Sequence, residues 1–261
     1  MLNFEKLISG PQGGKDQVEA YLLDFFSKKN RKDYQIDPDT DEDQRKAIRI
    51  MFESKKDLPE RAELALSHDP LCLEAFFVYY LLSEDVFVNY RFRSYYDQIS
   101  HFGDLSDYQK KCYLKILDFY VEFLLDIGNY TTAIKVQKQI LKLGGKSERD
   151  IDRLCFMYCM IEKADDLYRL YLDQAFNAYD YLLLIVTLLK HEDTLKAAEV
   201  VEDMLKNVKY AEYLDHLWDL DEKDSEQEAF YQTVEDCYEY ISAIPDFFTF
   251  ISQVHHPVAE E

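Results

Sequence analysis

Apolar residues recur at spacings of three and four along nearly the whole chain, and sustained alternation of apolar and polar residues is scarce. This spacing places apolar side chains on one face of an α-helix. Glycine (7) and proline (6) together supply 13 of the 261 residues, about 5% where ordinary usage is near 12%. A chain with so few turn-forming residues has little room for β-hairpins, so the pattern predicts an all-α protein.

The positions of the helices follow from this periodicity and from the residues that end a helix. Pro59 lies where a first-turn proline loses no hydrogen bond, and Gly103 and Gly128 follow apolar segments, where a left-handed residue ends a helix. Ser225 and Glu228 have the spacing of a capping box. We expect helices at about 16–29, 43–56, 59–67, 71–83, 88–101, 107–127, 130–143, 148–161, 164–176, 178–190, 194–206, 209–218, 225–242 and 245–254.

The expected helices are mostly joined by two to six residues, which favours antiparallel packing of consecutive helices. The highly charged stretch 30–42 is longer and is the best candidate for a linker. We therefore expect three regions: an N-terminal helix with a charged linker (1–42), a helical array (43–218), and C-terminal capping helices with a mobile tail (219–261). Many short helices joined tightly suit stacked pairs better than a four-helix bundle.

A small residue recurs near the start of three expected second helices. Ala133, Ala164 and Ala197 are 31 and 33 residues apart. A small side chain lets two helices cross closely, so this spacing suggests an internal repeat. The alternative is an irregular all-α domain in which the spacing is accidental.

The segment 60–82 (ERAELALSHDPLCLEAFFVYYLL), with Ala65, Asp69-Pro70 and Ala75, resembles the junction between tetratricopeptide repeats. That superfamily has a period of about 34 residues. The segment 117–145, with Gly128, Tyr130 and Ala133, is the next most similar. The resemblance covers roughly residues 43–206. It implies a right-handed superhelix of stacked antiparallel helix pairs, closed by terminal capping helices, in which the first helix of each pair lines a groove.

Motifs that carry catalysis or bind cofactors are missing from the sequence. It contains no GxxxxGK[ST], GxGxxG, GxSxG or HExxH string. Cys155 and Cys159 share one helix face, but no second ligand pair follows, so they are expected in the core. The stretch 37–41 begins like a calcium loop, yet Glu42 and Ile48 stand where glycine and glutamate are needed. It is better interpreted as a solvated linker ending in an N-cap. We expect no cofactor, no metal and no enzymatic activity.

The charge of the chain limits its partners. With 30 Lys+Arg against 51 Asp+Glu the net charge is −21, whereas nucleic-acid binding needs a concentrated positive surface. The basic cluster 28–32 lies at a helix end and is followed directly by acidic residues. The first ten residues lack the pattern of a secretory signal, and the longest apolar stretch, 181–189, has nine residues. Five scattered cysteines do not suggest a disulfide framework. We expect a cytoplasmic protein with reduced thiols and no membrane insertion.

The candidate binding residues lie on one stripe of three expected first helices. An acidic, aromatic-edged groove would attract basic segments. We therefore expect a non-enzymatic module that binds a basic or amphipathic protein segment. The alternative for each stripe is that its charged residues are solvated surface and its apolar residues are core. The groove residues are Glu74 and Phe77 on 73–85, Lys115, Asp118 and Glu122 on 114–126, and Tyr179 and Leu182 on 178–190.

Two other functions stay open from the sequence. One is a peptide-sensing regulator with a helical-repeat sensor domain, and the other is an enzyme on an all-α scaffold. The aromatic residues of the last two expected helices suit a cap on the end of the array. They equally suit a surface for self-association, which would make a homo-oligomer. These residues are Phe230, Tyr231, Tyr238, Tyr240, Phe247, Phe248 and Phe250.

Overall fold

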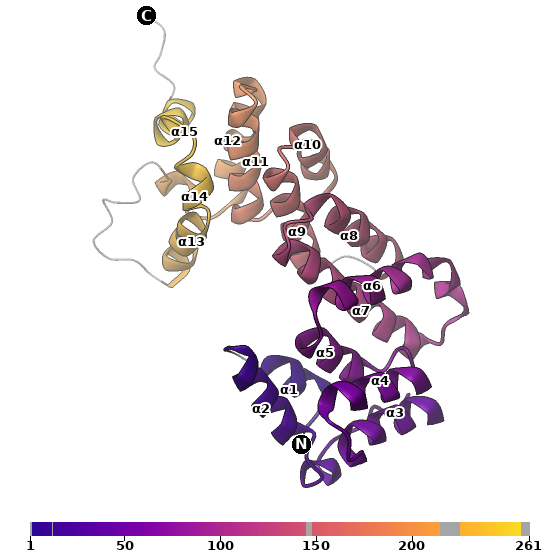
Figure 1. The fold of residues 1–261 in the computed structure, drawn as a ribbon. Helices are drawn as coiled ribbons and strands as arrows, with labels where there is room; N and C mark the ends of the chain where they lie inside the picture. The colour runs from indigo at the N-terminus through magenta and orange to yellow at the C-terminus, as the bar shows by residue number, and fades with distance from the viewer. Residues whose placement is uncertain (1, 12, 145–147, 215–224, 257–261) are drawn as a thin grey trace, which may run out of the picture. The chain divides into compact units, whose positions relative to one another are not determined.

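The structure, a computed structural model, describes residues 2–11, 13–144, 148–214 and 225–256 (Figure 1). These residues form helices joined by short connections, and no strand occurs among them. The β-type pairing present in this part of the chain is an isolated parallel bridge between Leu2 and Tyr34. The predicted all-α class is confirmed. No helix of the described residues combines the length and the apolar character needed to cross a membrane.

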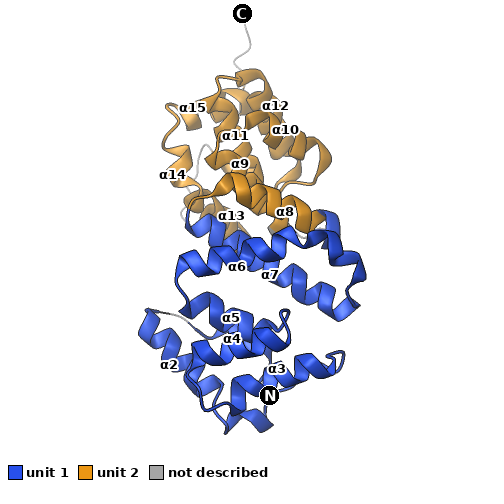
Figure 2. Cartoon of the chain, turned by 45° about the vertical axis from the view of Figure 1, so that its right-hand side comes forward, with its two compact units in different colours: residues 1–127, 142–144 blue, residues 128–141, 145–261 orange. Residues whose placement is uncertain are grey.

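The chain divides into two compact units, shown in blue and orange in Figure 2. Unit 1 contains residues 1–127 and 142–144, and unit 2 contains residues 128–141 and 145–261. This division falls inside the stretch that the sequence suggests is one array. The stretch 30–42, expected to be a linker, belongs to unit 1.

Helices of unit 1 pack mainly against their neighbours in sequence, with α3 on α4 and α4 on α5. Asp41 caps α3 and forms a capping box with Gln44, and Ser106 with Gln109 does the same for α7. Pro59 lies in the first turn of α4, as predicted. The elements are α1 (Phe4–Ser9), α2 (Lys15–Phe25), η1 (Asn30–Lys32), α3 (Glu42–Glu53), α4 (Leu58–His68), α5 (Leu73–Leu82), α6 (Asp85–Asp97), η2 (Ile99–Asp104) and α7 (Asp107–Asp126).

The segment before α3 is part of the core of unit 1. Both α1 and α2 pack on α5. Tyr34 is buried between the rings of Phe25 and Phe52, with ring centroids 6.0 and 5.1 Å away. Tyr34, in the stretch 30–42, is only 6% exposed. The interpretation of 37–41 as a solvated linker is wrong at Thr40, which is 4% exposed. It is right at Asp41, which is an N-cap.

Unit 2 is built around α11, which packs against α9, α10, α12, α13 and α14. Its residues 182–186 are completely buried. The predicted helix at 225–242 is interrupted at Cys237, and Ala211–Tyr213 form only a 3-10 turn; the rest of the predicted 209–218 helix, residues 215–218, lies outside the described residues. The elements are α8 (Tyr130–Gly144, of which residues 142–144 belong to unit 1), α9 (Glu148–Met160), α10 (Ala164–Asp173), α11 (Ala178–Lys190), α12 (Thr194–Asn207), η3 (Ala211–Tyr213), α13 (Ser225–Asp236), α14 (Tyr238–Ile241) and α15 (Phe247–His255).

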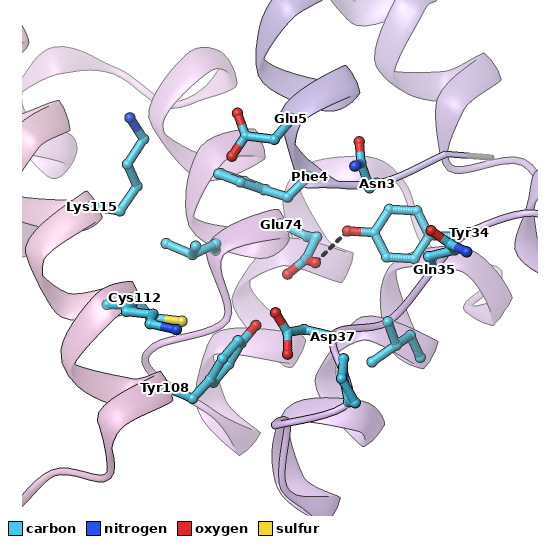
Figure 3. A pocket seen from close by; sticks show the side chains of 14 residues that line it. Asn3, Phe4, Glu5, Tyr34, Gln35, Asp37, Glu74, Tyr108, Cys112 and Lys115 are labelled. Atoms are coloured by element: carbon cyan, nitrogen blue, oxygen red, sulfur yellow. Dashed lines mark hydrogen bonds between the residues drawn. The ribbon is translucent and has the colours of Figure 1, made fainter.

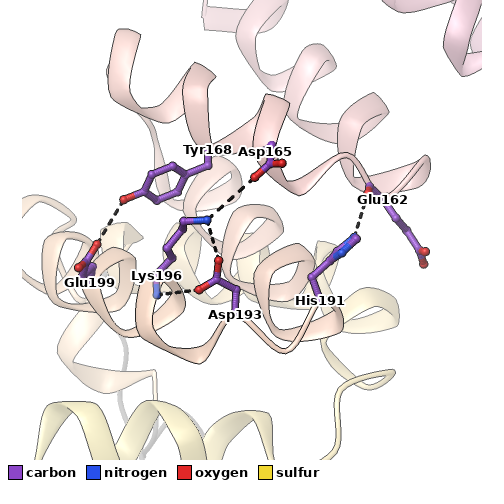
Figure 4. Close-up of polar contacts among 7 residues, drawn as sticks. All are labelled: Glu162, Asp165, Tyr168, His191, Asp193, Lys196 and Glu199. Carbon is purple, nitrogen blue, oxygen red and sulfur yellow. Dashed lines mark hydrogen bonds and ion pairs between the residues drawn. The ribbon is translucent and has the colours of Figure 1, made fainter.

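Two turns of unit 2 have the same backbone geometry. Glu162, between α9 and α10, and Glu192, between α11 and α12, both adopt positive φ (54° and 59°). The next amide in each turn, Lys163 or Asp193, donates to a carbonyl five residues earlier, at 2.9 and 3.0 Å. Side chains join the two turns, because the His191 ring contacts the Glu162 carbonyl at 2.9 Å (Figure 4).

A lysine adds to the link between these two turns. The Lys196 ammonium lies 2.7 Å from the Asp193 carboxylate and 4.0 Å from Asp165, and it faces the ring of Tyr168 at 5.3 Å (Figure 4). The Tyr168 hydroxyl in turn donates to Glu199 at 3.2 Å. These polar contacts connect the hairpins α9–α10 and α11–α12 at one end.

The equivalent buried positions of α8, α10 and α12 are not the three alanines that the sequence singled out. Ala133 and Ala197 are each the fourth residue of their helix, α8 and α12, and both are fully buried. In α10 the fourth residue is Leu167, also fully buried, whereas Ala164 is the first residue of the helix and is partly exposed. Ala164 is therefore not the equivalent of the other two alanines.

Candidate functional site

A cavity of about 660 Å³ opens in unit 1 among the N-terminal segment, the connection before α3, the start of α5 and the first half of α7. We call it the Glu74 cavity (Figure 3). Most of its named side chains are polar or aromatic. Its lining residues are Asn3, Phe4, Glu5, Tyr34, Gln35, Ile36, Asp37, Pro38, Leu73, Glu74, Tyr108, Lys111, Cys112 and Lys115.

Backbone pairing at the isolated bridge holds two walls of this cavity together. The Leu2 amide donates to the Asp33 carbonyl at 3.0 Å, and the Gln35 amide donates to the Leu2 carbonyl at 2.8 Å. The aromatic contacts of Tyr34 fix its ring, so that its hydroxyl reaches Glu74 (Figure 3). Segments that are distant in sequence thereby meet at one carboxylate.

Glu74 lies at the inner wall of the cavity and is only 5% exposed. It accepts a hydrogen bond from the Tyr34 hydroxyl and one from the Cys72 thiol, the latter with 3.6 Å between sulfur and oxygen. Burial raises the pKa of Glu74, and the bonds from Tyr34 and Cys72 act against that rise because they favour the ionised form. Glu74 is thus a desolvated acid that two donors hold in place.

The opposite wall comes from one face of α7. Tyr108, Lys111, Cys112 and Lys115 follow the spacing of a single helical face. Lys115 forms an ion pair with Asp118 at 2.9 Å, and its ammonium lies over the ring of Phe119 at 5.3 Å. The charge of Lys115 is therefore partly balanced outside the cavity.

The two remaining carboxylates of the lining, those of Asp37 and Glu5, belong to exposed residues. One oxygen of Asp37 accepts from the Asp39 amide at 2.9 Å. Figure 3 shows the Asp37 carboxylate directed toward the same space as Glu74. The cavity can therefore supply several carboxylate oxygens to a bound cation.

The thiols beside this cavity are not activated nucleophiles. Burial raises the pKa of Cys112 to about 12 and also raises the pKa of Cys72, so both stay protonated near neutral pH. All five cysteines are buried and free of disulfides. Within the described residues, no group of three or more His, Cys, Asp or Glu side chains is placed to hold a metal ion.

Two of the residues singled out in the sequence, Glu74 and Lys115, meet at this cavity. Phe77 is 5% exposed and packs on the cavity residue Phe4, with ring centroids 6.3 Å apart. Asp118 contacts the cavity indirectly, through its ion pair with Lys115. Glu122 is half-buried one turn further along α7.

The other two predicted residues belong to unit 2. Tyr179 is half-buried and lines a recess of about 440 Å³ together with Asp152, Asn177 and Asp236. Leu182 is completely buried in α11, so it is a core residue, which is the alternative that the sequence left open for the apolar positions of these stripes.

Several polar residues of these sites escaped the sequence interpretation. Tyr34 lies in a connection, where no periodicity marks it, whereas Asp37 entered only as the start of the rejected calcium-loop pattern and Tyr108 only as part of the helix expected at 107–127. The sequence selected Glu74 from a helical stripe, and a further signal for its burial existed, because α5 (LEAFFVYYLL) is apolar on all sides and a charged residue within it is expected to be buried. In unit 2, Asp180 is 1% exposed; burial and the neighbouring Asp152 raise its pKa.

Comparison of the chain with protein-family models, with curated proteins and with solved structures found no match. A function therefore has to be inferred from the residues of the cavities themselves.

Proposed function

We propose that this chain is a non-enzymatic interaction module that binds a basic or amphipathic segment of a protein partner. In this proposal a lysine or arginine side chain of the partner enters the Glu74 cavity. The observation that carries the proposal is the convergence of Glu5, Asp37 and Glu74, from three separate segments, on one cavity.

The balance of charge around the cavity favours a cationic guest. Two lysines also line it, but Lys115 is already paired with Asp118 at 2.9 Å. The lining therefore contains three carboxyl groups, and Lys111 is the lysine of the lining that is left to balance their charge. The net charge of −21 adds a long-range field that attracts basic segments and speeds their association.

The size of the cavity suits one side chain and its immediate neighbours. Its volume of about 660 Å³ lies within the range of about 300–1,000 Å³ that is typical of ligand sites. The rings of Phe4, Tyr34 and Tyr108 offer contact for the methylene stem of a long cationic side chain, while the carboxylates face its charged end.

The proposal includes the architecture that the resemblance implies. Sequential packing of α3, α4 and α5 in unit 1, and of α9 to α12 in unit 2, is what stacked helix pairs require. We expect the module to form a right-handed superhelix of the tetratricopeptide type. We also expect it to act in the cytoplasm.

Peptide titrations test the proposal. A fluorescently labelled amphipathic peptide rich in lysine and arginine is titrated with the full chain at low and high salt, beside an acidic peptide of the same length. We expect the basic peptide to bind and its affinity to fall with salt, because the attraction is electrostatic. Equal binding of the two peptides, or binding of neither, would contradict the proposal.

A matched pair of double variants locates the binding. Asp37→Asn/Glu74→Gln removes two carboxylates from the cavity, whereas Glu19→Gln/Glu63→Gln removes two from exposed positions on α2 and α4. We expect the first variant to weaken binding of the basic peptide by roughly tenfold or more and the second by less than about threefold. Equal losses would mean that only the net charge matters and that the Glu74 cavity is not the site.

A further inference from the structure

A second, smaller cavity in unit 1 has a different lining. Its volume is about 270 Å³, near the lower limit of about 300 Å³ for ligand sites. We call it the Asp69 cavity. It is lined by Asp69, Pro70, Leu71, Tyr95, Gln98, His101, Phe102, Leu105, Gln109 and Tyr113.

The Asp69 cavity and the Glu74 cavity share two structural elements. Asp69 and Leu71 of the connection between α4 and α5 face the smaller cavity, whereas Leu73 and Glu74 face the larger one. In α7, residues 109 and 113 line the smaller cavity, and residues 108, 111, 112 and 115 line the larger one. The two cavities are therefore distinct sites.

Three aromatic rings from α6, η2 and α7 wall the Asp69 cavity. The rings of Phe102 and Tyr113 have centroids 5.7 Å apart at an interplanar angle of 60°, and those of Tyr95 and Tyr113 are 6.5 Å apart at 75°. The hydroxyl of Tyr95 donates to the Pro70 carbonyl, and that of Tyr113 donates to the Tyr95 carbonyl. Since both hydroxyls are held, the two tyrosine rings have fixed positions.

A buried carboxylate completes the lining. Asp69 is 6% exposed, and its Oδ1 accepts from the Leu71 amide at 3.0 Å. Its Oδ2 is buried and accepts no hydrogen bond from the part of the chain that is described. Burial raises the pKa of Asp69 to about 6, so the group is mainly ionised at pH 7.5.

The cationic side chain next to this cavity is Arg91 of α6, which acts to lower the pKa of the Tyr95 hydroxyl but is not part of the lining. Among the described residues that line the cavity, none is lysine or arginine. His101 is the basic side chain of the lining; it is 76% exposed and lies 3.7 Å from Asp104. A bound cation would therefore lie beside the half-buried Phe102 and the buried rings of Tyr95 and Tyr113, near a buried negative charge, without competing with a lysine or arginine of the lining.

We infer that the Asp69 cavity binds a methylated ammonium group. Aromatic faces attract cations, and enclosure by several rings is a common way to recognise quaternary ammonium groups. The Oδ2 atom of Asp69 is not open to solvent, so the carboxylate acts through its charge and not through a hydrogen bond to the ligand. This site goes beyond the proposed function, and its test does not depend on peptide binding.

A primary ammonium fits this lining less well than a methylated one. It needs up to three hydrogen-bond acceptors, whereas the Tyr95 carbonyl already accepts from the Tyr113 hydroxyl and the Gln98 amide, and the Pro70 carbonyl accepts from the Tyr95 hydroxyl. Stripping its hydration shell against aromatic walls is costly, because few polar groups replace the lost water. Methylation lowers this cost and adds apolar surface that contacts the rings.

Choline and its neutral analogue 3,3-dimethylbutan-1-ol form the direct test, because they have the same shape and differ in charge. Binding of each to the full chain is measured by calorimetry at pH 7.5. We expect choline to bind and the neutral analogue to bind at least about tenfold more weakly. Equal affinities, or no detectable binding of choline, would overturn the inference.

Three variants assign the binding to this cavity. Asp69→Asn keeps the oxygen that accepts from Leu71, and we expect it to weaken choline binding about tenfold. Phe102→Leu keeps an apolar side chain without the ring, and we expect a loss of roughly threefold to tenfold. Asp107→Asn, a change at an exposed aspartate, should leave the affinity unchanged. An unchanged affinity in Asp69→Asn, with the variant folded by circular dichroism, would overturn the assignment.

A further pair of titrations distinguishes the two sources of such a group. A short neutral peptide with one trimethyl-lysine is compared with free choline, and the same peptide with unmodified lysine is the control. Tighter binding of the methylated peptide assigns the site to a modified protein, and tighter binding of choline assigns it to a free small molecule. Equal binding of methylated and unmethylated peptide, with choline no tighter than its neutral analogue, would contradict the inference.

Discussion

A buried carboxylate lies beside each of the two cavities described in unit 1, and the two carboxylates differ in their hydrogen-bond donors and in their surroundings. Glu74 receives hydrogen bonds from Tyr34 and Cys72 and faces a polar cavity that lysines also line. Asp69 receives one backbone amide bond, has one oxygen that accepts no hydrogen bond from the described residues, and lies beside aromatic walls. Only four residues, 70–73, at the end of the connection and the start of α5, separate the two acids.

This difference indicates two kinds of recognition. Glu74 already accepts hydrogen bonds from side chains and lies in a roomy polar cavity. Such a carboxylate suits a hydrated cationic side chain, because the cation can donate to the carboxylate and to other acceptors at the same time. A carboxylate without such donors, behind aromatic rings, suits a cation that carries its charge without needing hydrogen bonds. Two buried carboxylates of the same charge, Glu74 and Asp69, can therefore suit two classes of ligand because their surroundings differ.

The largest effect that we expect concerns Tyr34, the donor that distinguishes Glu74 from Asp69. Tyr34→Phe removes this hydrogen bond and leaves the buried carboxyl with one weak thiol donor. We expect the free energy of unfolding of unit 1 to fall by about 1–3 kcal/mol, as measured by urea denaturation. Tyr90→Phe, at a residue that is 78% exposed, is the control and should change little. No difference between the two variants would show that the Tyr34–Glu74 bond does not stabilise the fold.

The next prediction concerns the stability cost of Asp69. Its folded pKa, about 6, lies above its ordinary value of 3.8, so the folded state disfavours the ionised form. Wild-type protein should therefore lose stability as the pH rises through this window, whereas Asp69→Asn should not. At about pH 7.5 we expect Asp69→Asn to be more stable by about 1–2 kcal/mol, and this difference should disappear near pH 4. A variant that is less stable at both pH values would contradict the prediction.

The affinity for choline should depend on pH through the same group. Below pH 6 Asp69 takes up a proton and the cavity loses its negative charge, so the affinity should fall by about tenfold in total and then level off near the affinity of Asp69→Asn. The charged groups near Asp69 are Asp41 and Asp43 at the start of α3, Glu74 in α5 and His101 in η2, and Arg91 of α6 acts on the neighbouring Tyr95 hydroxyl. Calorimetry on wild type and Asp69→Asn checks this, because the variant should show a flatter profile. Parallel profiles would assign the pH dependence to a neighbouring group.

The smallest effect is expected between the two cavities. They open on different faces of α7, so choline should not displace the basic peptide, and saturation with choline should change the peptide's affinity by less than about twofold. Fluorescence anisotropy of the labelled peptide measures this directly. Complete displacement would mean that both cations bind at one site.

The sequence predicted helices better than it predicted sites, and particular residues show why. The long helices α7 and α11 have clear periodicity and capping residues, so their bounds were predicted closely. The six-residue helix α1 is too short for periodicity to reveal. The sequence therefore did not predict it, and the N-terminal wall of the Glu74 cavity was missed. Asp69 was noted only as part of a repeat junction, because local sequence does not show which aromatic rings will surround a carboxylate.

The site residues illustrate the same limit. Glu74 and Lys115 were selected from helical stripes, and they do meet at one cavity. The stripe pattern could not show that Phe77 and Leu182 are buried, because a helix that is apolar on all sides has no face that periodicity can mark as exposed.

The most direct test of the central claim, that the Glu74 cavity binds a cationic segment, is a nuclear magnetic resonance titration of the isotopically labelled full chain with the basic peptide. Our account predicts that the amide signals that shift most belong to residues 3–5, 34–37, 73–74 and 108–115, in the segments that line the cavity. Shifts confined to unit 2, or spread evenly over acidic surface residues, would contradict it.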